Sequence, residues 1–126
     1  SLLPEDSMRL KVNGLPPLLQ LAISNIISNA CKYSEDHTAY VGLGVAEKKV
    51  IIFVEDHGVG IPPEDIDFIF DPYFRGSNVG NYNGYGIGLP LSRNIILMHE
   101  GQIEIKSEVG KGTIVIIQLP TANIQL

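Results

Sequence analysis

A stripe of polar side chains follows one face of the first helix that the sequence predicts. Asn25, Asn29, Lys32 and Tyr33 are spaced i, i+4, i+7 and i+8. At about 100° per residue, these positions share a narrow sector of an α-helix. Amide carbonyl oxygens can coordinate a hard cation, and a lysine ammonium can meet phosphate as a point charge. The stripe therefore indicates a site for a cation and a phosphate, and a solvated helix face is the alternative interpretation.

A second candidate is a turn containing Asp56, Gly58 and Gly60, which directly follows the apolar run at 50–54. A carboxylate in this place can accept a hydrogen bond from an exocyclic amine. The glycines would let the backbone approach a flat ring closely. The alternative is an ordinary tight turn that the Asp56 side chain closes on its own backbone.

The third candidate, Gly84-x-Gly86-x-Gly88-Leu89, opens the last predicted helix. Exposed backbone N–H groups at such a helix N-terminus bind phosphate with the help of the helix dipole. The spacing matches neither the dinucleotide-binding fingerprint, which follows a strand, nor the P-loop, which ends in Gly-Lys-Ser/Thr. Arg75, which precedes this stretch, is a further candidate partner for phosphate.

Helices and strands must bring these candidates together. Apolar spacing and the placement of proline predict helices over 17–33, 63–69 and 87–99. Alternating or continuous apolar runs predict strands over 8–12, 39–46, 50–55, 102–107 and 112–119. The strand at 50–55 is apolar enough to be covered on both faces, Gly101 is expected to end the last helix, and residues 71–86 are expected to form a mobile loop. This order predicts one α/β layer sandwich with helices on one face of the sheet.

The composition limits the class of protein. A chain of 126 residues with 44% hydrophobic and 18% charged residues is typical of one soluble globular domain. The net charge of −5 argues against a nucleic-acid partner, so an anionic ligand would need a metal, a lysine or backbone amides.

The cellular setting is also an expectation. A single cysteine, Cys31, excludes an internal disulfide and fits a reducing compartment. No apolar run approaches the roughly 20 residues of a membrane helix, so we expect a cytoplasmic domain without membrane contact. The chain begins at Ser1 without a signal-peptide pattern. We expect a piece excised from a larger protein, which could be an inner-membrane receptor.

In combination and in order, the motifs resemble the catalytic, ATP-binding domain of sensor histidine kinases, a branch of the GHKL superfamily. The matching segments are NIISNACKY at 25–33 (N box), DHGVGI at 56–61 (G1 box), FDPYFRG at 70–76 (F box), GYGIGL at 84–89 (G2 box), HEG at 99–101 and GKGT at 110–113. The resemblance covers about residues 8–120, and we expect residues 1–126 to be one such domain. It implies the Bergerat fold, a two-layer α/β sandwich whose mixed β-sheet carries three helices on one face. ATP would lie between these helices and a lid at 76–86.

The resemblance also implies roles for the residues that would hold Mg²⁺ and the phosphates. Asn29 and Asn25 would ligate Mg²⁺, while Lys32 and Arg75 would meet phosphate groups. These four residues would form the catalytic set. The G2-box residues that would cradle phosphate with backbone amides are Gly86, Gly88 and Leu89, and Gly84 of the same box would also belong to the nucleotide site.

A second set of residues would bind the base. Asp56 would accept a hydrogen bond from the adenine amino group, with Thr113 near it through water, and Tyr33 would lie beside the nucleotide. The residues that would line the adenine pocket are Gly58, Gly60 and Ile61.

One departure from the ATP-hydrolysing members of the superfamily bears on mechanism. Those members place a glutamate four residues before the N-box asparagine as a base for water. This chain has Asn25 there, and an amide cannot take up the proton. We therefore expect slow hydrolysis and no autophosphorylation by this chain alone. The γ-phosphate would pass to a histidine on a separate dimerisation domain of the same parent, and indirectly to a response regulator receiver domain, in a two-component phosphorelay.

Two other functions within the superfamily stay open. An anti-sigma-factor-type serine kinase would usually keep the N-box glutamate, so Asn25 counts against it. A degenerate nucleotide-sensing module is the other alternative, and the presence of Asn29, Asp56 and the G2 glycines counts against that one.

Overall fold

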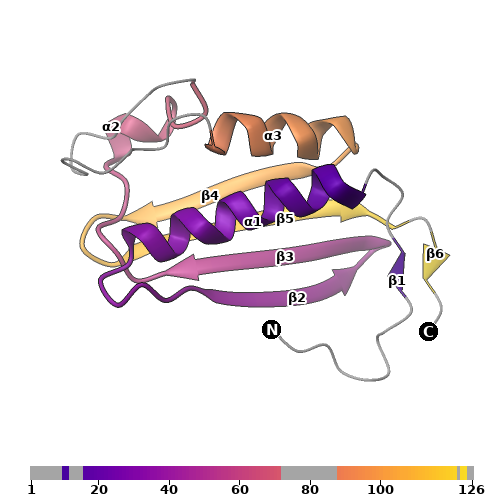
Figure 1. Ribbon diagram of the computed structural model, residues 1–126, viewed down its shortest axis with the longest axis horizontal. Helices are drawn as coiled ribbons and strands as arrows, with labels where there is room; N and C mark the ends of the chain where they lie inside the picture. The colour runs from indigo at the N-terminus through magenta and orange to yellow at the C-terminus, as the bar shows by residue number, and fades with distance from the viewer. Residues whose placement is uncertain (1–9, 12–15, 72–87, 122, 125–126) are drawn as a thin grey trace.

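The computed structural model describes residues 10–11, 16–71, 88–121 and 123–124 (Figure 1). The elements are β1 (Leu10–Lys11), α1 (Pro16–Tyr33), β2 (Tyr40–Ala46), β3 (Lys49–Asp56), α2 (Pro63–Ile66), α3 (Gly88–Met98), β4 (Gln102–Glu108), β5 (Gly112–Pro120) and β6 (Asn123–Ile124). The predicted helix at 63–69 is shorter than expected, and the other predicted helices and strands of the main body lie within one or two residues of these bounds. Among the described residues, no helix has both the length and the apolar character needed to cross a membrane.

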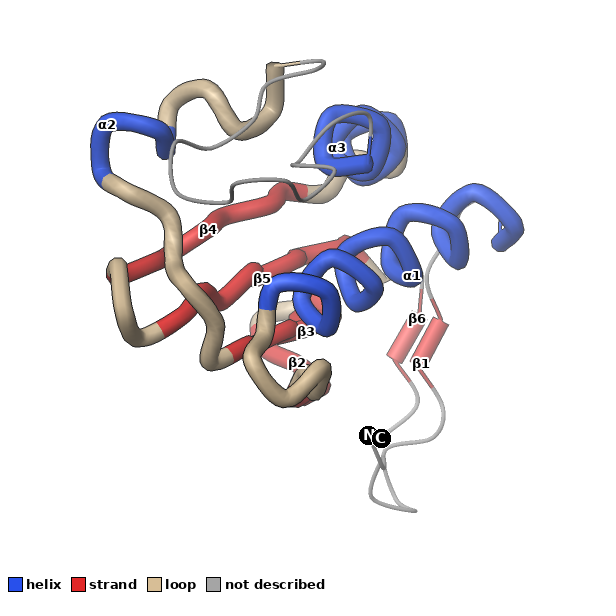
Figure 2. The backbone as a smooth tube through the Cα atoms, turned by 60° about the vertical axis from the view of Figure 1, so that its left-hand side comes forward, coloured by secondary structure: helices blue, strands red, loops and turns tan. Residues whose placement is uncertain are grey.

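The main sheet has the strand order β2-β3-β5-β4. Helices α1 and α3 lie side by side across one face of this sheet, as Figures 1 and 2 both show. The predicted α/β two-layer sandwich is therefore confirmed.

The mixed sheet that we expected is wrong for these strands, because every pair within β2-β3-β5-β4 is antiparallel. β3 and β4 do run in the same direction, joined through α2 and α3. They do not pair with each other because β5 returns between them and bonds to both. β3 and β4 are therefore parallel in direction, as strands joined through a helix usually are, but they are not hydrogen-bonded to each other.

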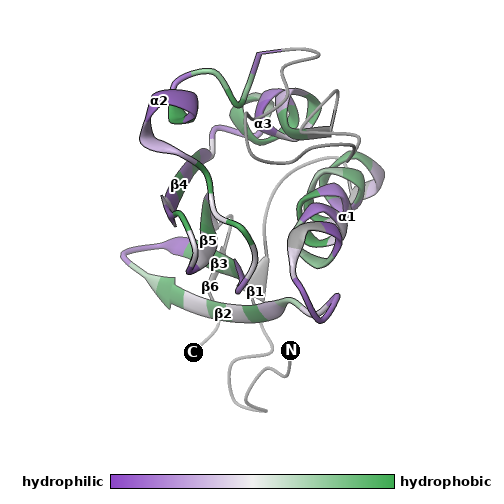
Figure 3. Cartoon of the chain, turned by 90° about the vertical axis from the view of Figure 1, so that its left-hand side faces the viewer, coloured by the Kyte–Doolittle hydropathy of each residue, from purple (hydrophilic) through white to green (hydrophobic). Residues whose placement is uncertain are grey.

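The core lies between the helices and the inner face of the sheet. Because side chains alternate along a strand, β3 turns Val50, Ile52 and Val54 inward. Each of these is at most 8% exposed. Helix α1 contributes Ala22 and Ile26, spaced one turn apart and at most 1% exposed. The alternation of hydrophobic and less hydrophobic residues along a strand is visible as colour bands on β2 and β4 in Figure 3.

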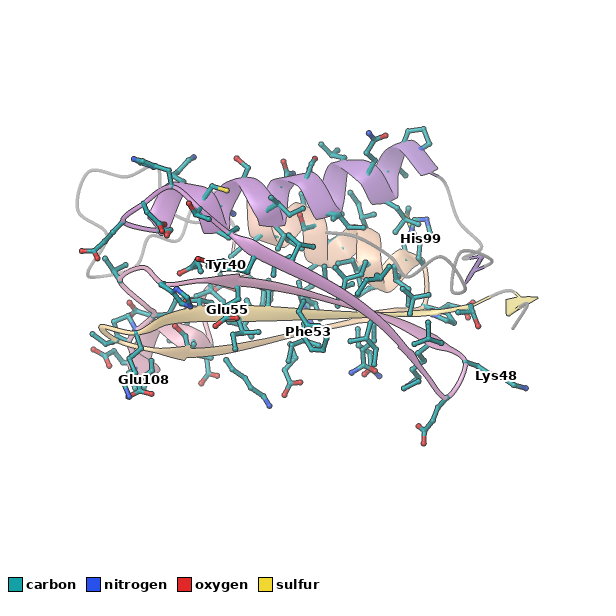
Figure 4. All side chains as sticks on the ribbon, turned by 90° about the horizontal axis from the view of Figure 1, so that it is seen from below. Tyr40, Lys48, Phe53, Glu55, His99 and Glu108 are labelled. Carbon is teal, nitrogen blue, oxygen red and sulfur yellow. The ribbon has the colours of Figure 1, made fainter. Side chains whose placement is uncertain are left out.

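The outer face of β3 corrects another expectation, since this strand is not covered on both faces. Phe53 is 41% exposed on the face away from the helices (Figure 4). A β-carbon built on Gly42, its partner on β2, would lie 3.4 Å from the Phe53 ring. Phe53 therefore packs over a glycine on the adjacent strand rather than against a second layer of elements.

Helix α3 ends in a Schellman motif, but Gly101 is not its left-handed residue. Glu100 has φ 61°, the Gly101 N–H donates to the Ile96 carbonyl at 2.9 Å, and the Glu100 N–H donates to the Leu97 carbonyl at 2.9 Å. Glycine is needed at 101 for a different reason. A β-carbon there would collide with the Gln118 carbonyl oxygen on β5.

Of the strand predicted over 8–12, the structure describes Leu10–Lys11. These two residues do not join the main sheet but pair antiparallel with Asn123–Ile124 in a separate two-stranded sheet. Figure 2 shows β1 and β6 together beyond one end of α1. The strand β6 was not predicted, because two residues are too few to show a period of apolar side chains.

The β2–β3 hairpin has an unusual turn sequence. Ala46 pairs with Lys49, and the two residues between them, Glu47 and Lys48, have φ values of 52° and 65°. A turn with positive φ at both central positions normally contains asparagine or glycine. Two hydrogen bonds offset part of the steric cost of this turn. The Lys48 carbonyl accepts them, at 2.9 Å each, from the backbone N–H and the hydroxyl of Thr121.

We predict that Lys48→Gly raises the free energy of unfolding by about 1 kcal/mol, because glycine adopts positive φ without the steric cost of a β-carbon. The substitution keeps the Lys48 carbonyl and its two hydrogen bonds. Urea denaturation of both proteins measures the difference. Lys49→Gly is the matched control, because Lys49 is a paired strand residue where glycine lowers stability. Equal destabilisation by the two substitutions would contradict the strain at Lys48.

Candidate functional site

A pocket lies where α1 and the start of α3 meet the end of β3 and the start of β5. Its cavity volume is about 40 Å³. The residues that line it are Ile26, Asn29, Ala30, Asp56, Val59, Gly60, Ile61, Leu89, Ile105, Thr113 and Val115. Six of them were predicted as site residues from the sequence, namely Asn29, Asp56, Gly60, Ile61, Leu89 and Thr113. The structure therefore brings together residues from all three candidate motifs.

Asp56 is placed by the alternation of β3. It follows Val50, Ile52 and Val54 on the inner face, so its side chain turns toward the helices and is only 7% exposed. One carboxylate oxygen, Oδ1, accepts a hydrogen bond from the Gly58 N–H at 2.9 Å. Asp56 thus closes its own turn, as the alternative interpretation of this motif expected, and it also lines the pocket.

Burial raises the pKa of the Asp56 carboxyl above its ordinary value of 3.8. Backbone hydrogen bonds from Gly58 and Thr113 and the charge of His57 lower the pKa, while the nearby Glu55 raises it. Desolvation outweighs the opposing contributions because a charged group loses more than a neutral one when water is removed. A carboxyl whose pKa is raised by burial and that lines a cavity is typical of a functional position.

The two turns beside Asp56 lie directly on each other. The 56–61 turn contacts the β4–β5 turn at 108–112, and the Gly110 N–H donates to the Val59 carbonyl at 3.0 Å. Gly60 has φ 77°, and a β-carbon on it would overlap the Glu108 carbonyl group. Gly60 was expected to make room for a flat ring. The structure shows that it makes room for the neighbouring turn, while also lining the pocket.

Only part of the predicted polar stripe on α1 lies at the pocket. Asn29 lines the pocket, and its Nδ2 is buried without a hydrogen-bond partner among the described residues. Asn25 lies one turn earlier and is half-buried, and Lys32 is exposed. Neither of the two lines the cavity. Tyr33 ends α1, and its side chain lies outside the described part of the chain.

The glycine-rich stretch is also only partly described. Gly88 begins α3, and Leu89 is 4% exposed and lines the pocket. The predicted lid at 76–86 lies outside the described residues, as do Arg75, Gly84 and Gly86. Gly58 is buried and holds Asp56 through its N–H, but it does not line the cavity.

Ser107 is the residue of this region that sequence reasoning missed. Its hydroxyl accepts a hydrogen bond from the Ile61 N–H at 2.7 Å, lies 2.7 Å from the Thr113 hydroxyl and donates to the Gly112 carbonyl at 2.9 Å. A signal existed, because Ser107 continues the inward-facing series of Ile103 and Ile105 on β4. A hydroxyl at an inward position of an otherwise apolar series needs a polar partner.

The polar groups of the pocket are divided between two sides. Asp56 and Thr113 lie at the end of the sheet, and the Asn29 amide lies on α1. The rest of the lining is apolar apart from the backbone of Gly60. Within the described ranges, no group of three or more His, Cys, Asp or Glu residues could hold a metal ion.

Comparison with known proteins gives consistent matches. The family model described as "Histidine kinase-, DNA gyrase B-, and HSP90-like ATPase" matches residues 14–123. The sensor histidine kinase YclK of Bacillus subtilis is 39% identical over 100 residues, which make up 76% of this chain and 21% of that protein. The sensor histidine kinase RcsC of Escherichia coli is 34% identical over 123 residues, or 96% of this chain and 13% of that protein. The chain thus spans only a small part of the length of these relatives.

Solved structures agree with the sequence matches. The mycobacterial sensor histidine kinase MprB superimposes with a TM-score of 0.81 and 27% identity, over 89% of this chain and 78% of that chain. The catalytic domain of the histidine kinase ThkA, in a nucleotide-free form, gives a TM-score of 0.72 and 25% identity, over 86% of this chain and 71% of that chain.

We predict that Asp56→Asn stabilises the ligand-free protein at neutral pH. Because the folded-state pKa is raised, the folded chain holds this proton more tightly than the unfolded chain. Wild-type stability should therefore fall as the pH rises from about 3.8 through the raised pKa. Asparagine removes this loss and can still accept the Gly58 hydrogen bond.

Urea denaturation of the variant and the wild type between pH 3.5 and about pH 7.5 isolates the effect, because other groups cancel in the difference. The variant's advantage should grow with pH. Asp67→Asn, at an exposed position, is the matched control. An advantage that stays constant or shrinks as the pH rises would show that burial does not raise the pKa of Asp56.

Proposed function

The chain belongs to the family of histidine kinase-, DNA gyrase B- and HSP90-like ATPases, and on that premise we propose that its pocket binds Mg-ATP for phosphoryl transfer to a histidine. The relatives that match are sensor histidine kinases, so the domain corresponds to their ATP-binding catalytic part. The acceptor histidine would belong to a separate dimerisation domain of the same parent protein. A receiver domain of a response regulator would take the phosphoryl group in turn, in the cytoplasm.

The observation that carries this proposal is the division of polar groups in the pocket. The sheet side offers the buried Asp56 carboxylate, an acceptor suited to the amino group of adenine. The helix side offers the Asn29 amide, whose buried Nδ2 lacks a partner among the described residues. A buried polar atom without a partner is costly, and a polar ligand would remove that cost. The apolar side chains between the two ends suit the faces of a base.

The residues present fit the nucleotide and its cation. Asn29 and Asn25 would hold Mg²⁺ through their amide oxygens, and bound Mg²⁺ would neutralise phosphate charge. Leu89 lies in the first turn of α3, where free backbone N–H groups and the helix dipole favour phosphate. Thr113 would contact the base beside Asp56, in a pocket whose lining includes Gly60 and Ile61.

Some assignments stay predictions that rest on the sequence alone. These are phosphate binding by Lys32, Arg75, Gly84, Gly86 and Gly88, contact of Tyr33 with the nucleotide, and closure of a lid over 76–86. Gly58 acts through the hydrogen bond that holds Asp56 rather than through the cavity wall.

The residue at position 25 favours transfer over hydrolysis. An amide cannot accept the proton of an attacking water, so Asn25 leaves this chain without the base that the hydrolysing relatives use. What the chain's own residues supply is positioning and charge neutralisation, which account for most of the catalysis of phosphoryl transfer.

We expect titration calorimetry to detect Mg²⁺-dependent binding of ATP and ADP to the purified chain. Asp56→Asn should weaken ATP binding by about 1–3 kcal/mol, because a buried acceptor becomes mispaired. Asn29→Ala should reduce the dependence of binding on Mg²⁺. Asn94→Ala, an exposed asparagine on α3, is the matched control and should bind like the wild type. No heat with adenine nucleotides at millimolar concentration would refute the proposed function.

We also expect no self-labelling when the chain is incubated with γ-labelled ATP. Of its three histidines, His99 is 8% exposed with Nδ1 placed 2.7 Å from the Ile95 carbonyl oxygen. His57 lies in the turn beside Asp56, where its ring contacts Glu55 at 3.3 Å. His37 is exposed in the segment after α1. None of these rings lines the pocket.

Adding the dimerisation segment of the parent in trans should yield acid-labile label on that segment, and Asn29→Ala should abolish it. Stoichiometric acid-labile label on this chain by itself would contradict transfer to a separate acceptor domain.

A further inference from the structure

The Ser107 hydroxyl joins three segments at the sheet side of the pocket. It contacts the Ile61 backbone nitrogen at the end of the 56–61 turn, the Gly112 carbonyl at the start of β5, and the Thr113 hydroxyl. The distances to these atoms are 2.7, 2.9 and 2.7 Å. Ser107 itself does not line the cavity, whereas Ile61 and Thr113 do. Any effect of Ser107 on a ligand in this cavity therefore passes through its partners.

The number of hydrogens determines the direction of each bond. A serine hydroxyl has one hydrogen and two lone pairs. The Ile61 N–H occupies one lone pair, and the hydrogen is donated to the Gly112 carbonyl. Only a lone pair remains for Thr113, so the Thr113 hydroxyl must donate its single hydrogen to Ser107.

Because its hydrogen is donated to Ser107, the Thr113 hydroxyl can offer only lone pairs to the pocket. Asp56, which pairs with Thr113 in the β3–β5 ladder, is also an acceptor when ionised. Its Oδ1 is already held by the Gly58 N–H. The Asp56 and Thr113 side chains thus present acceptors and no donor to this end of the pocket.

We propose that Ser107 is a positioning residue for ligand specificity. By taking the hydroxyl hydrogen of Thr113, it keeps the sheet side of the pocket an acceptor surface that favours a 6-amino purine over a 6-oxo purine. The inference rests on the proposed function, because it takes the base to lie at this end. Without the Ser107 hydroxyl, Thr113 is free to turn its hydrogen into the pocket and donate to a carbonyl. Asp56 still disfavours that carbonyl, so discrimination is reduced rather than lost.

The test compares ATP with inosine triphosphate, which carries an oxygen where ATP carries the amine, by calorimetry on the full chain with Mg²⁺. In Ser107→Ala, the ratio of the inosine triphosphate to the ATP dissociation constant should fall about fivefold, the worth of one ordinary hydrogen bond. Ser107→Thr, which keeps a hydroxyl, should preserve the wild-type ratio. Ser24→Ala is the matched control, since the bond of Ser24 within the described residues is a local one, to the Leu21 carbonyl on the exposed side of α1.

Thr113→Val separates positioning from a merely structural role. If Ser107 acts through Thr113, adding Ser107→Ala to Thr113→Val should leave the ratio unchanged. Should Ser107→Ala fail to fold because the Ile61 N–H loses its partner, Ser107→Cys replaces it, with a weakly bonding thiol of similar size, and the ratio should again fall.

Three outcomes overturn the inference. Equal weakening of both nucleotides in Ser107→Ala, or in Ser107→Cys, would leave Ser107 only a structural role. An equal fall of the ratio with and without Thr113→Val would show that Thr113 is not the intermediary. Binding of neither nucleotide by the wild type would refute the proposed function as well, which distinguishes that failure from the other two.

Discussion

The site depends on the close contact between the 56–61 turn and the β4–β5 turn. Two glycines permit it: a β-carbon on Gly60 would overlap the Glu108 carbonyl, and one on Gly112, where φ is 127°, would overlap the Asp56 carbonyl. The backbone bond from Gly110 to Val59 then holds the turns together. This contact places Asp56 beside Thr113 at the end of the β3–β5 ladder, so the acceptor side of the pocket follows from backbone proximity.

The arrangement costs stability in the absence of a ligand. A buried carboxyl with a raised pKa and a buried amide without a partner among the described residues both disfavour the folded chain. A ligand with an amine at one end and anionic oxygens at the other would remove these costs, so the features that reduce stability are those that would contribute affinity. Proteins commonly break local rules of stability at functional sites for this reason.

Much of this organisation could be predicted, because it rests on periodicity. The helical spacing of Ala22, Ile26 and Ala30 fixes the buried side of α1, and alternation along β3 sends Asp56 inward. Features set by long-range contacts could not be predicted. The bond between the Ile61 N–H and Ser107 joins residues 46 positions apart, β5 intervenes between β3 and β4, and β1 pairs with a strand at the other end of the chain. The positive φ of Lys48 could not be predicted either, because lysine rarely adopts positive φ.

The central claim is that an adenine nucleotide binds between the sheet-side acceptors and the α1 amide. Chemical-shift mapping of ¹⁵N-labelled chain with Mg-ATP tests it most directly, because each backbone amide reports its own surroundings. Saturable shifts are predicted for Gly58, Gly60 and Thr113, together with the Asn29 side-chain amide, while Gly44 on the distant β2 stays unchanged. Shifts confined to β2 and the outer face of the sheet, with these amides unaffected, would contradict the account.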